Sequence, residues 1–273
     1  KTLKMATIRA QAADAKKSEA AERLFRWLRL NQWIATATVG WIPITIYDKT
    51  QWNPPGCKDW REAVQLLRGK TCYGGVDLSK STDLTAFVLV FPPQEGLDRW
   101  VALPTGWMPL DGIDARERED HVPYRDWIRA GFLHGCKGDI IDFEDVAYAV
   151  VQAARDYDLR MVGFDPYLGA TVMQRIREAL SGTVTEVVEI PQGIRTISPP
   201  MKELERLIRA HEMLHVHNTA ARQCFLNVRC VSDDNENIKP TKKKSRGRID
   251  LTVGWIIAFA TAMLQPAPTL ADS

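Results

Sequence analysis

Short apolar runs separated by turns begin near residue 71 and continue through most of the chain. Three of them, Tyr73–Asp77, Ala86–Pro92 and Trp100–Pro104, have the length of strands and are joined by short polar stretches. Connections this short join antiparallel neighbours, so we expect three consecutive antiparallel strands. Residues 105–140 are polar and aromatic and show no clear period.

Beyond residue 140 the apolar positions alternate between helical and strand spacing. The pattern predicts a helix over Phe143–Tyr157, a strand over Arg160–Asp165, a helix over Leu168–Leu180, a strand over Thr185–Pro191 and a helix over Pro199–Met213 with His211 facing inward. A hairpin is expected from Phe225–Val231 and the charged turn Asp233–Lys244, followed by an apolar helix from about Arg248. Antiparallel strands followed by helix and strand units describe an α/β domain whose mixed sheet is flanked by helices.

The first 70 residues differ from the rest. Ala10–Leu30 is rich in Ala, Lys, Glu and Arg with apolar residues at helical spacing, which predicts an amphipathic helix. A tryptophan-dotted segment follows and is broken at Pro54-Pro55-Gly56. We expect a helical linker or arm over residues 1–70, the main domain over 71–265 and a flexible tail over 266–273. The chain begins with Lys1 rather than Met, which suggests a fragment of a longer polypeptide.

Length and composition indicate a soluble globular protein. The chain has 273 residues, of which 45% are hydrophobic, enough for a core of ordinary size. The longest apolar run, Leu251–Leu264, is shorter than the roughly 20 residues that cross a bilayer, and nothing at the start signals export. The five cysteines form no C-x-x-C pair, so free thiols are expected rather than a zinc site or disulfides.

The charge is unevenly distributed. The formal net charge is only +2, but the stretch from Arg195 to Arg248 holds twelve basic residues and six acidic ones. A basic region in a nearly neutral protein suits a polyanionic partner, although a solvated charged face is the simpler alternative.

Three carboxylates occupy comparable places: Asp77 ends the first strand, Asp165 ends the fourth, and Asp250 opens the last helix. If the first and fourth strands are parallel neighbours, Asp77 and Asp165 emerge at the sheet edge where ligands of open α/β sheets bind. Clustered carboxylates repel one another, and Mg²⁺ relieves this repulsion. Two such ions about 4 Å apart hold the attacking and leaving oxygens of a phosphodiester cleavage. Asp83, across the turn, could bind the second ion or orient water.

Each acid also has a simpler explanation. Asp250 could only complement a helix dipole, and Asp165 before Pro166 could only form a turn. Asp77 is harder to explain in this way, because Asp is disfavoured in strands.

A set of short motifs, in this order, resembles the large terminase subunit of tailed bacteriophages. The resemblance covers nearly the whole chain. The motifs are Phe25-Arg26, Leu30–Trp33, Gly75–Ser79, Asp83–Ala86, Val122–Trp127, Gly131–Leu133, Gly163–Pro166, Gln192-Gly193, Lys202–Glu205, Asn227-Val228, Asn237–Pro240, Lys242–Ser245 and Arg248–Asp250.

The resemblance implies an RNase H-like nuclease domain that cuts concatemeric double-stranded viral DNA into genome units, using two Mg²⁺ or Mn²⁺ ions. The family's acids carry over onto Asp77, Asp165 and Asp250, with Asp83 as a fourth. Implied partners are DNA, the small terminase subunit and the portal, in the cytoplasm of an infected bacterium and without a membrane. The family's ATPase is not expected here, because the sequence has no G-x-x-x-x-G-K-[ST] phosphate loop.

The basic turn before Asp250 is predicted to contact DNA. Its residues are Lys242, Lys243, Lys244, Arg246 and Arg248. They can neutralise phosphates beside the scissile bond, and no base-reading element is apparent, so cleavage should depend little on sequence. The alternative is a mobile, solvated hairpin tip. His215 and His217 are not assigned as metal ligands; surface or satisfied core histidines are expected.

Two other functions remain open. A phosphotransferase of the actin and sugar-kinase kind also begins with a strand bearing Gly-x-Asp-x-Ser, but Gly163–Pro166 does not supply its second phosphate loop. A non-catalytic DNA-binding or assembly module would keep the fold and tolerate loss of the carboxylates.

Overall fold

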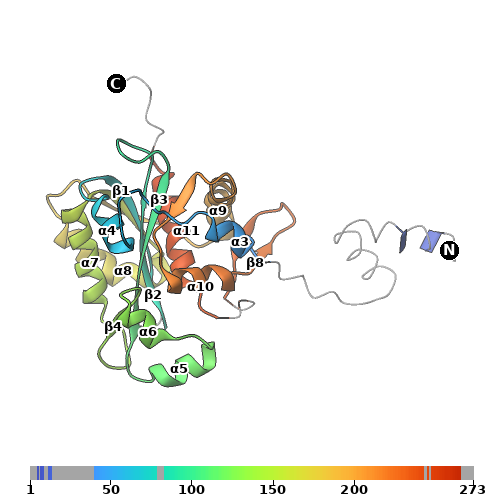
Figure 1. Ribbon diagram of the computed structural model, residues 1–273, viewed down its shortest axis with the longest axis horizontal. Helices are drawn as coiled ribbons and strands as arrows, with labels where there is room; N and C mark the ends of the chain where they lie inside the picture. The colour runs from blue at the N-terminus through green and yellow to red at the C-terminus, as the bar shows by residue number, and fades with distance from the viewer. Residues whose placement is uncertain are drawn as a thin grey trace. The chain divides into compact units, whose positions relative to one another are not determined.

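A computed structural model of the chain describes residues 40–78, 83–242, 245 and 247–265, together with the single positions 5, 7, 8, 12 and 13 (Figure 1). The chain divides into two units, Lys1–Val39 and Gly40–Ser273. The helix expected over Ala10–Leu30 and the tail over 266–273 lie outside the described stretches. The compact unit begins at Gly40, so it includes residues 40–70, for which the sequence predicts an arm.

The central sheet has seven strands in the order β4-β3-β2-β1-β5-β6, with β7 pairing on β3. The strands are β1 (Thr71–Asp77), β2 (Thr85–Phe91), β3 (Trp100–Pro109), β4 (His134–Cys136), β5 (Asp158–Phe164), β6 (Glu186–Glu189) and β7 (Met213–His215). β1, β2 and β3 are consecutive antiparallel neighbours, as predicted. β5 runs parallel to β1, and β6 runs parallel to β5. The mixed α/β sheet expected from the sequence is therefore confirmed.

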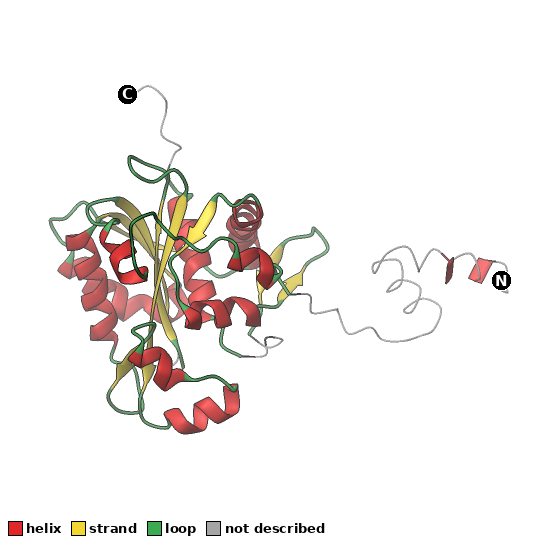
Figure 2. Ribbon diagram, in the orientation of Figure 1, coloured by secondary structure: helices red, strands yellow, loops and turns green. Residues whose placement is uncertain are grey.

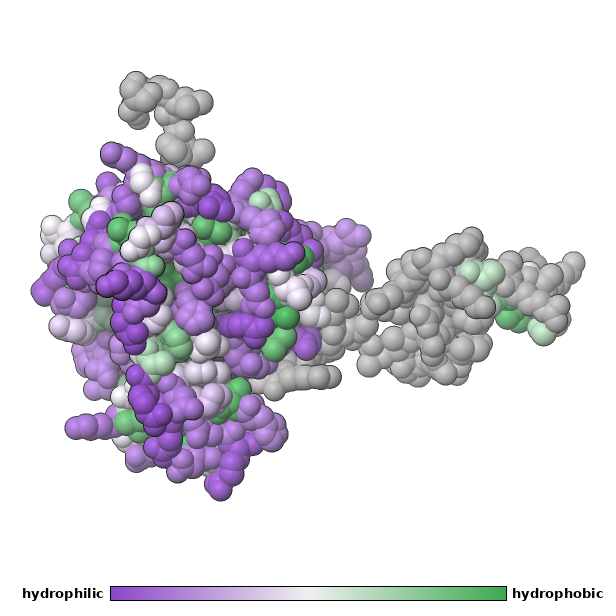
Figure 3. Space-filling view, in the orientation of Figure 1, coloured by the Kyte–Doolittle hydropathy of each residue, from purple (hydrophilic) through white to green (hydrophobic). Residues whose placement is uncertain are grey.

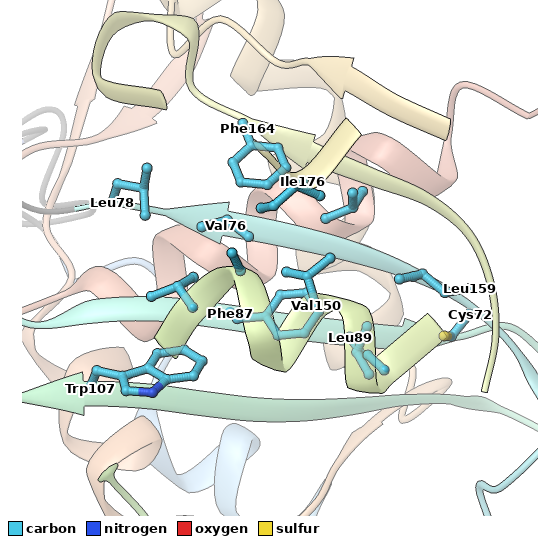
Figure 4. Packing of buried hydrophobic residues seen from close by; sticks show 14 of the residues in the cluster. Cys72, Val76, Leu78, Phe87, Leu89, Trp107, Val150, Leu159, Phe164 and Ile176 are labelled. Atoms are coloured by element: carbon cyan, nitrogen blue, oxygen red, sulfur yellow. The ribbon is translucent and has the colours of Figure 1, made fainter. Parts of the chain in front are cut away.

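Helices cover both faces of this sheet (Figure 2). They are α3 (Ile44–Asp48), α4 (Trp60–Gln65), α5 (Ile113–Asp120), α6 (Tyr124–Arg129), α7 (Phe143–Asp156), α8 (Pro166–Ala179), α9 (Ile194–Arg209), α10 (Thr219–Asn227) and α11 (Asp250–Ala262). Alternate residues of β2 point to opposite faces, as the period of a strand requires. Phe87 and Leu89 pack with α7 and α8, and Figure 4 shows them beside Val150 of α7. Val88 packs on the other face with α9 and α11.

Several boundaries differ from those predicted. Residues 105–140 hold the end of β3, then α5, α6 and β4, all too short to show a period. Phe225, expected in a strand, lies in the last turn of α10, and the hairpin consists of β8 (Cys230–Ser232) and β9 (Ile238–Pro240). α9 begins at Ile194, so Pro199 is inside it rather than in its first turn.

His211 is also placed differently from the prediction. It follows the end of α9 in a left-handed conformation with φ 58°, and it is exposed rather than inward. α9 instead keeps Leu204, Leu207 and Ile208 buried, as the periodicity indicates. The predicted apolar stripe is therefore correct up to the helix end, and only its last member is wrong.

α11 packs on β1 with almost no space between the two backbones. A Cβ atom added to Gly75 would lie 2.1 Å from the backbone nitrogen of Ala258 and 2.5 Å from the carbonyl oxygen of Gly254. Every residue of α11 is buried, as expected for the apolar run. This contact fixes the position of the helix along β1, and with it the position of Asp250 at the helix start.

Residues 40–50 attach to the domain through a cluster of aromatic rings. Tyr47 is buried and stacks on His215 with ring centroids 4.0 Å apart. The Nε2 atom of His215 lies 3.1 Å from the carbonyl oxygen of Tyr47, and its Nδ1 atom lies 3.3 Å from that of Val216. The expectation of a satisfied core histidine is confirmed at this position.

The described residues contain no helix long and apolar enough to cross a membrane. The face in Figure 3 is mostly hydrophilic, with hydrophobic residues in separate spots. All five cysteines are free thiols, as predicted.

Gly75→Ala should destabilise the domain by at least about 3 kcal/mol, because the added methyl group meets backbone atoms that cannot rotate away. Gly40→Ala is the matched control, since its Cβ would meet only an arginine side-chain atom at 3.8 Å. Urea unfolding followed by circular dichroism would compare the two. Equal midpoints would contradict the close approach of α11 and β1.

His215 should make the domain sensitive to acid. Burial lowers the pKa of His215 to about 4, although the two facing carbonyls favour the charged ring. The folded state therefore binds fewer protons than the unfolded state between pH 4 and 6.5, and stability falls as the pH drops through this interval. The wild-type free energy of unfolding should decrease by about 2 kcal/mol more than that of His215→Gln between pH 6.5 and 4.5. His211→Gln, at an exposed histidine, should behave like the wild type.

Candidate active site

The carboxyl ends of β1 and β5 bring two of the predicted acids to one edge of the sheet. Val76 is in register with Phe164, so Asp77 and Asp165 leave the two parallel strands side by side. Asp250 is the first residue of α11, which packs along β1. The charges of Asp250 and Asp165 both act on Asp77. The structure thus brings together the three acids singled out from the sequence.

Asp77 is a buried carboxylate with incomplete hydrogen bonding. Its exposed fraction is 4%, and its Oδ1 atom accepts a hydrogen bond of 3.2 Å from Nε2 of Gln192. Its buried Oδ2 atom has no hydrogen-bond donor in the described structure. Burial raises the pKa of Asp77 to about 7; Asp250 and Asp165 add to this increase, while Lys242 and Gln192 oppose it.

Asp250 is even less exposed, at 1%, and its partner is Lys242. The Nζ atom of Lys242 lies 2.5 Å from Oδ1 of Asp250 and 3.7 Å from Oδ2 of Asp77. Burial of this ammonium works against its charge, but Asp77 and Asp250 outweigh burial and raise the pKa of Lys242 above its usual value. A protonated lysine therefore stands between the two carboxylates.

Asp165 serves the local helix as well as the acidic edge. It is the N-cap of α8, and its Oδ1 atom accepts a hydrogen bond of 3.1 Å from the backbone nitrogen of Tyr167. Its side chain is only partly buried. Asp165 therefore has a local structural role, as the simpler explanation expects, and also lies beside Asp77 at the acidic edge.

Asp83 belongs to a second ionic cluster built around Arg248. The guanidinium of Arg248 pairs with Asp83, and its Nε atom donates to Oδ2 of Asp120 at 2.9 Å and to the hydroxyl of Tyr124 at 3.0 Å. The same hydroxyl donates to Asp120 at 2.6 Å. Arg248 lies two residues before Asp250, the first residue of α11, so this cluster fixes the chain where it enters the helix.

The basic turn is only partly described. Lys243, Lys244 and Arg246 lie outside the described residues. Lys242 is bound to the acids, and the Arg248 side chain is 18% exposed and paired with carboxylates. The sequence does not predict Asp120 and Tyr124 as members of the site. Tyr124 lies in the Val122–Trp127 motif of the resemblance, but only the fold brings α5 and α6 to Arg248.

The donors at this edge fit a hard divalent cation. Carboxylate oxygens are the ligands such ions prefer, and Oδ2 of Asp77 is a buried acceptor that lacks a donor. Within the described ranges, no three His, Cys, Asp or Glu side chains converge as a preformed metal site. Lys242 supplies the positive charge between Asp77 and Asp250 instead.

The acidic edge lies apart from a large cavity of the domain. A cavity of about 570 Å³ lies elsewhere, lined by residues of β2, β3, β4 and α7 such as Leu103, His134 and Gln152, and by none of the four acids.

An α/β domain with acids clustered at the ends of parallel strands belongs to a class suited to phosphodiester chemistry. Within this class, the family model of the terminase large subunit endonuclease domain matches residues 1–265, and the chain belongs to that family. The large terminase subunit of Enterobacteria phage HK97 is 27% identical over 252 residues, covering 92% of this chain and 47% of the phage protein.

Two further comparisons agree. The crystal structure of the HK97 large terminase superposes with a TM-score of 0.70 and 26% identity over 94% of this chain and 50% of that chain. Protein YmfN of Escherichia coli strain K12 is 23% identical over 271 residues, covering 96% of this chain and 57% of YmfN. This chain spans about half the length of the relatives it matches. The predicted RNase H-like fold and terminase relationship are confirmed.

Asp77→Asn should stabilise the metal-free protein at pH 8. The raised pKa means that the folded state binds the Asp77 proton more tightly than the unfolded state does, so stability falls as the pH rises from about 4 to about 7. The uncharged amide that replaces the carboxylate in Asp77→Asn does not titrate, so this loss of stability at high pH does not occur in that variant. We expect a gain of about 1–3 kcal/mol, or a rise in melting temperature of about 3–10 °C.

The matched control for this measurement is Asp98→Asn, at a side chain that is 82% exposed. Differential scanning fluorimetry at pH 5 and pH 8, in EDTA, would follow all three proteins. A lower melting temperature for Asp77→Asn than for Asp98→Asn at pH 8 would contradict the electrostatic cost assigned to Asp77.

Proposed function

We propose that this domain is a divalent-metal-dependent endonuclease that hydrolyses phosphodiester bonds of double-stranded DNA. The observation that carries the proposal is the buried pair Asp77 and Asp250, with Asp165 beside it at one sheet edge. Burying carboxylates together is costly, and a structure without a function for them has no reason to keep them. Membership of the terminase endonuclease family supports this reaction class.

Asp77, Asp165 and Asp250 would hold Mg²⁺ or Mn²⁺, in the two-ion arrangement expected from the resemblance. The metal supplies charge for the attacking and leaving oxygens when it is bound. Gln192 fixes the orientation of Asp77 through its hydrogen bond to Oδ1. Asp83 remains a candidate fourth acid; its pairing with Arg248 also gives it a positioning role, because Arg248 anchors the residues that lead to Asp250.

The substrate proposed is concatemeric viral DNA, cut into genome units during packaging. Lys242, Lys243, Lys244 and Arg246 are proposed to neutralise DNA phosphates, which would give binding that weakens with salt and depends little on sequence. Arg248 is retained as a predicted contact, although its guanidinium pairs with Asp83 and Asp120. The small terminase subunit and the portal are proposed partners of the whole protein.

The test is nicking of supercoiled plasmid by the purified protein in Mn²⁺ or Mg²⁺. We expect cleavage with either metal, none in EDTA, and a loss of at least about a hundredfold in Asp77→Asn and Asp250→Asn, because each removes a charged ligand. Asp98→Asn should cut like the wild type.

Cleavage that persists in EDTA or in Asp77→Asn would overturn the proposed mechanism. Salt-sensitive DNA binding without cleavage in either metal would support the non-catalytic module instead.

A further inference from the structure

Lys242 occupies the place between the two buried acids where a cation is needed. Its ammonium lies 2.5 Å from Asp250 and 3.7 Å from Asp77. The side chains of Asp77 and Asp250 are 6% and 2% exposed, whereas that of Lys242 is 53% exposed. The acids are therefore held in the core, while the lysine reaches them from the surface and has room to leave.

The ammonium satisfies the two acids unequally. It touches Asp250, but at 3.7 Å it is beyond hydrogen-bond distance from Oδ2 of Asp77, an atom that has no donor in the described structure. A divalent ion carries twice the charge of an ammonium and accepts oxygen ligands from several directions at short range. Replacing the ammonium by such an ion would therefore satisfy both acids.

The position of Lys242 in the chain favours such an exchange. It follows β9 and precedes α11 by eight residues, in the stretch that the sequence marks as the basic turn. Arg248 in the same stretch is different, because its side chain is 18% exposed and paired with Asp83 and Asp120. Of these two described basic side chains, Lys242 contacts the buried acid Asp250, whereas Arg248 fixes the basic turn to Asp83 and Asp120.

We propose that Lys242 is a built-in counter-ion that competes with the divalent metal for Asp77 and Asp250. This inference rests on the proposed metal-dependent function. In the metal-free protein the ammonium offsets part of the negative charge of the acid pair, and metal binding must displace it. The lysine thereby lowers the metal affinity of the free domain, and its displacement places a positive charge at the mouth of the site, where a DNA phosphate would lie.

The proposal has a consequence for regulation. A group that binds the displaced ammonium raises the affinity of the acids for metal. By thermodynamic linkage, metal binding raises the affinity of the domain for that group by the same factor. A DNA phosphate at the edge is such a group. The domain would then acquire its metal fully only when DNA is in place, which limits cleavage by a domain that has no substrate.

The test measures Mn²⁺ affinity in the absence of DNA by isothermal titration calorimetry on the full chain. Lys242→Gln should bind Mn²⁺ at least tenfold more tightly than the wild type, because the competing charge is gone. Lys242→Met, which keeps the length of the stem, should do the same. Lys242→Arg keeps the charge and should stay near wild type, and Lys239→Gln on β9 is the control for a general change of charge.

A second readout is the melting temperature with and without Mn²⁺. The Gln and Met variants should melt lower than wild type in EDTA, because Asp250 loses its partner, and should gain more from Mn²⁺. If the wild type binds Mn²⁺ and both Lys242 variants bind it with equal or weaker affinity than the wild type, the counter-ion role is overturned. The metal site is unaffected by that result. If no protein shows Mn²⁺ binding that the substitution Asp77→Asn abolishes, the metal site itself is overturned, and the inference with it.

Discussion

The contact between α11 and β1 is the constraint on which the site depends. Gly75 and Gly254 have no side chains, so the backbone of α11 approaches β1 more closely than it could if either position carried a larger residue. The approach sets how far α11 extends along β1, and Asp250 at its first position is brought to the end of that strand. The fully apolar sequence of α11 follows from the same contact, because a helix sunk between the sheet and α9 has no solvated face.

That geometry creates an electrostatic cost at the acidic edge. Burial raises the pKa of Asp77, the nearby charge of Asp250 adds to the increase, and the Oδ2 atom of Asp77 has no hydrogen-bond donor among the described residues. Lys242 offsets part of the cost in the absence of metal. The arrangement is typical of functional sites, where stability is given up so that charged groups are held in place before the substrate arrives.

Arg248 connects this edge to the small lobe formed by α5 and α6. Its backbone carbonyl accepts a hydrogen bond from Asn227 at the end of α10, while its guanidinium reaches Asp83, Asp120 and Tyr124. Four segments distant in sequence thus meet at the residue that leads into α11.

The sequence by itself determined the order of most elements and the set of candidate acids. Strand periodicity located β1, β2 and β5 and marked Asp77 and Asp165 at strand ends as candidates, and the ordered motifs of the family resemblance supported them. Long apolar runs and recurring spacings are local properties, which is why they can be recognised in one chain. The three-residue strand β4 and the short helices α5 and α6 have no such signal, so the sequence predicts no element at their positions. Met213, the first residue of β7, is predicted instead as the end of a helix.

Tertiary structure alone decided which charges meet. Lys242 and Arg248 are both basic residues in one polar stretch, and the sequence predicts the same role for both, as DNA contacts. The fold turns Lys242 onto Asp77 and Asp250 and surrounds Arg248 with acids from other segments. Contacts between residues far apart in the chain depend on the packing of α11 on Gly75, and no local pattern encodes them.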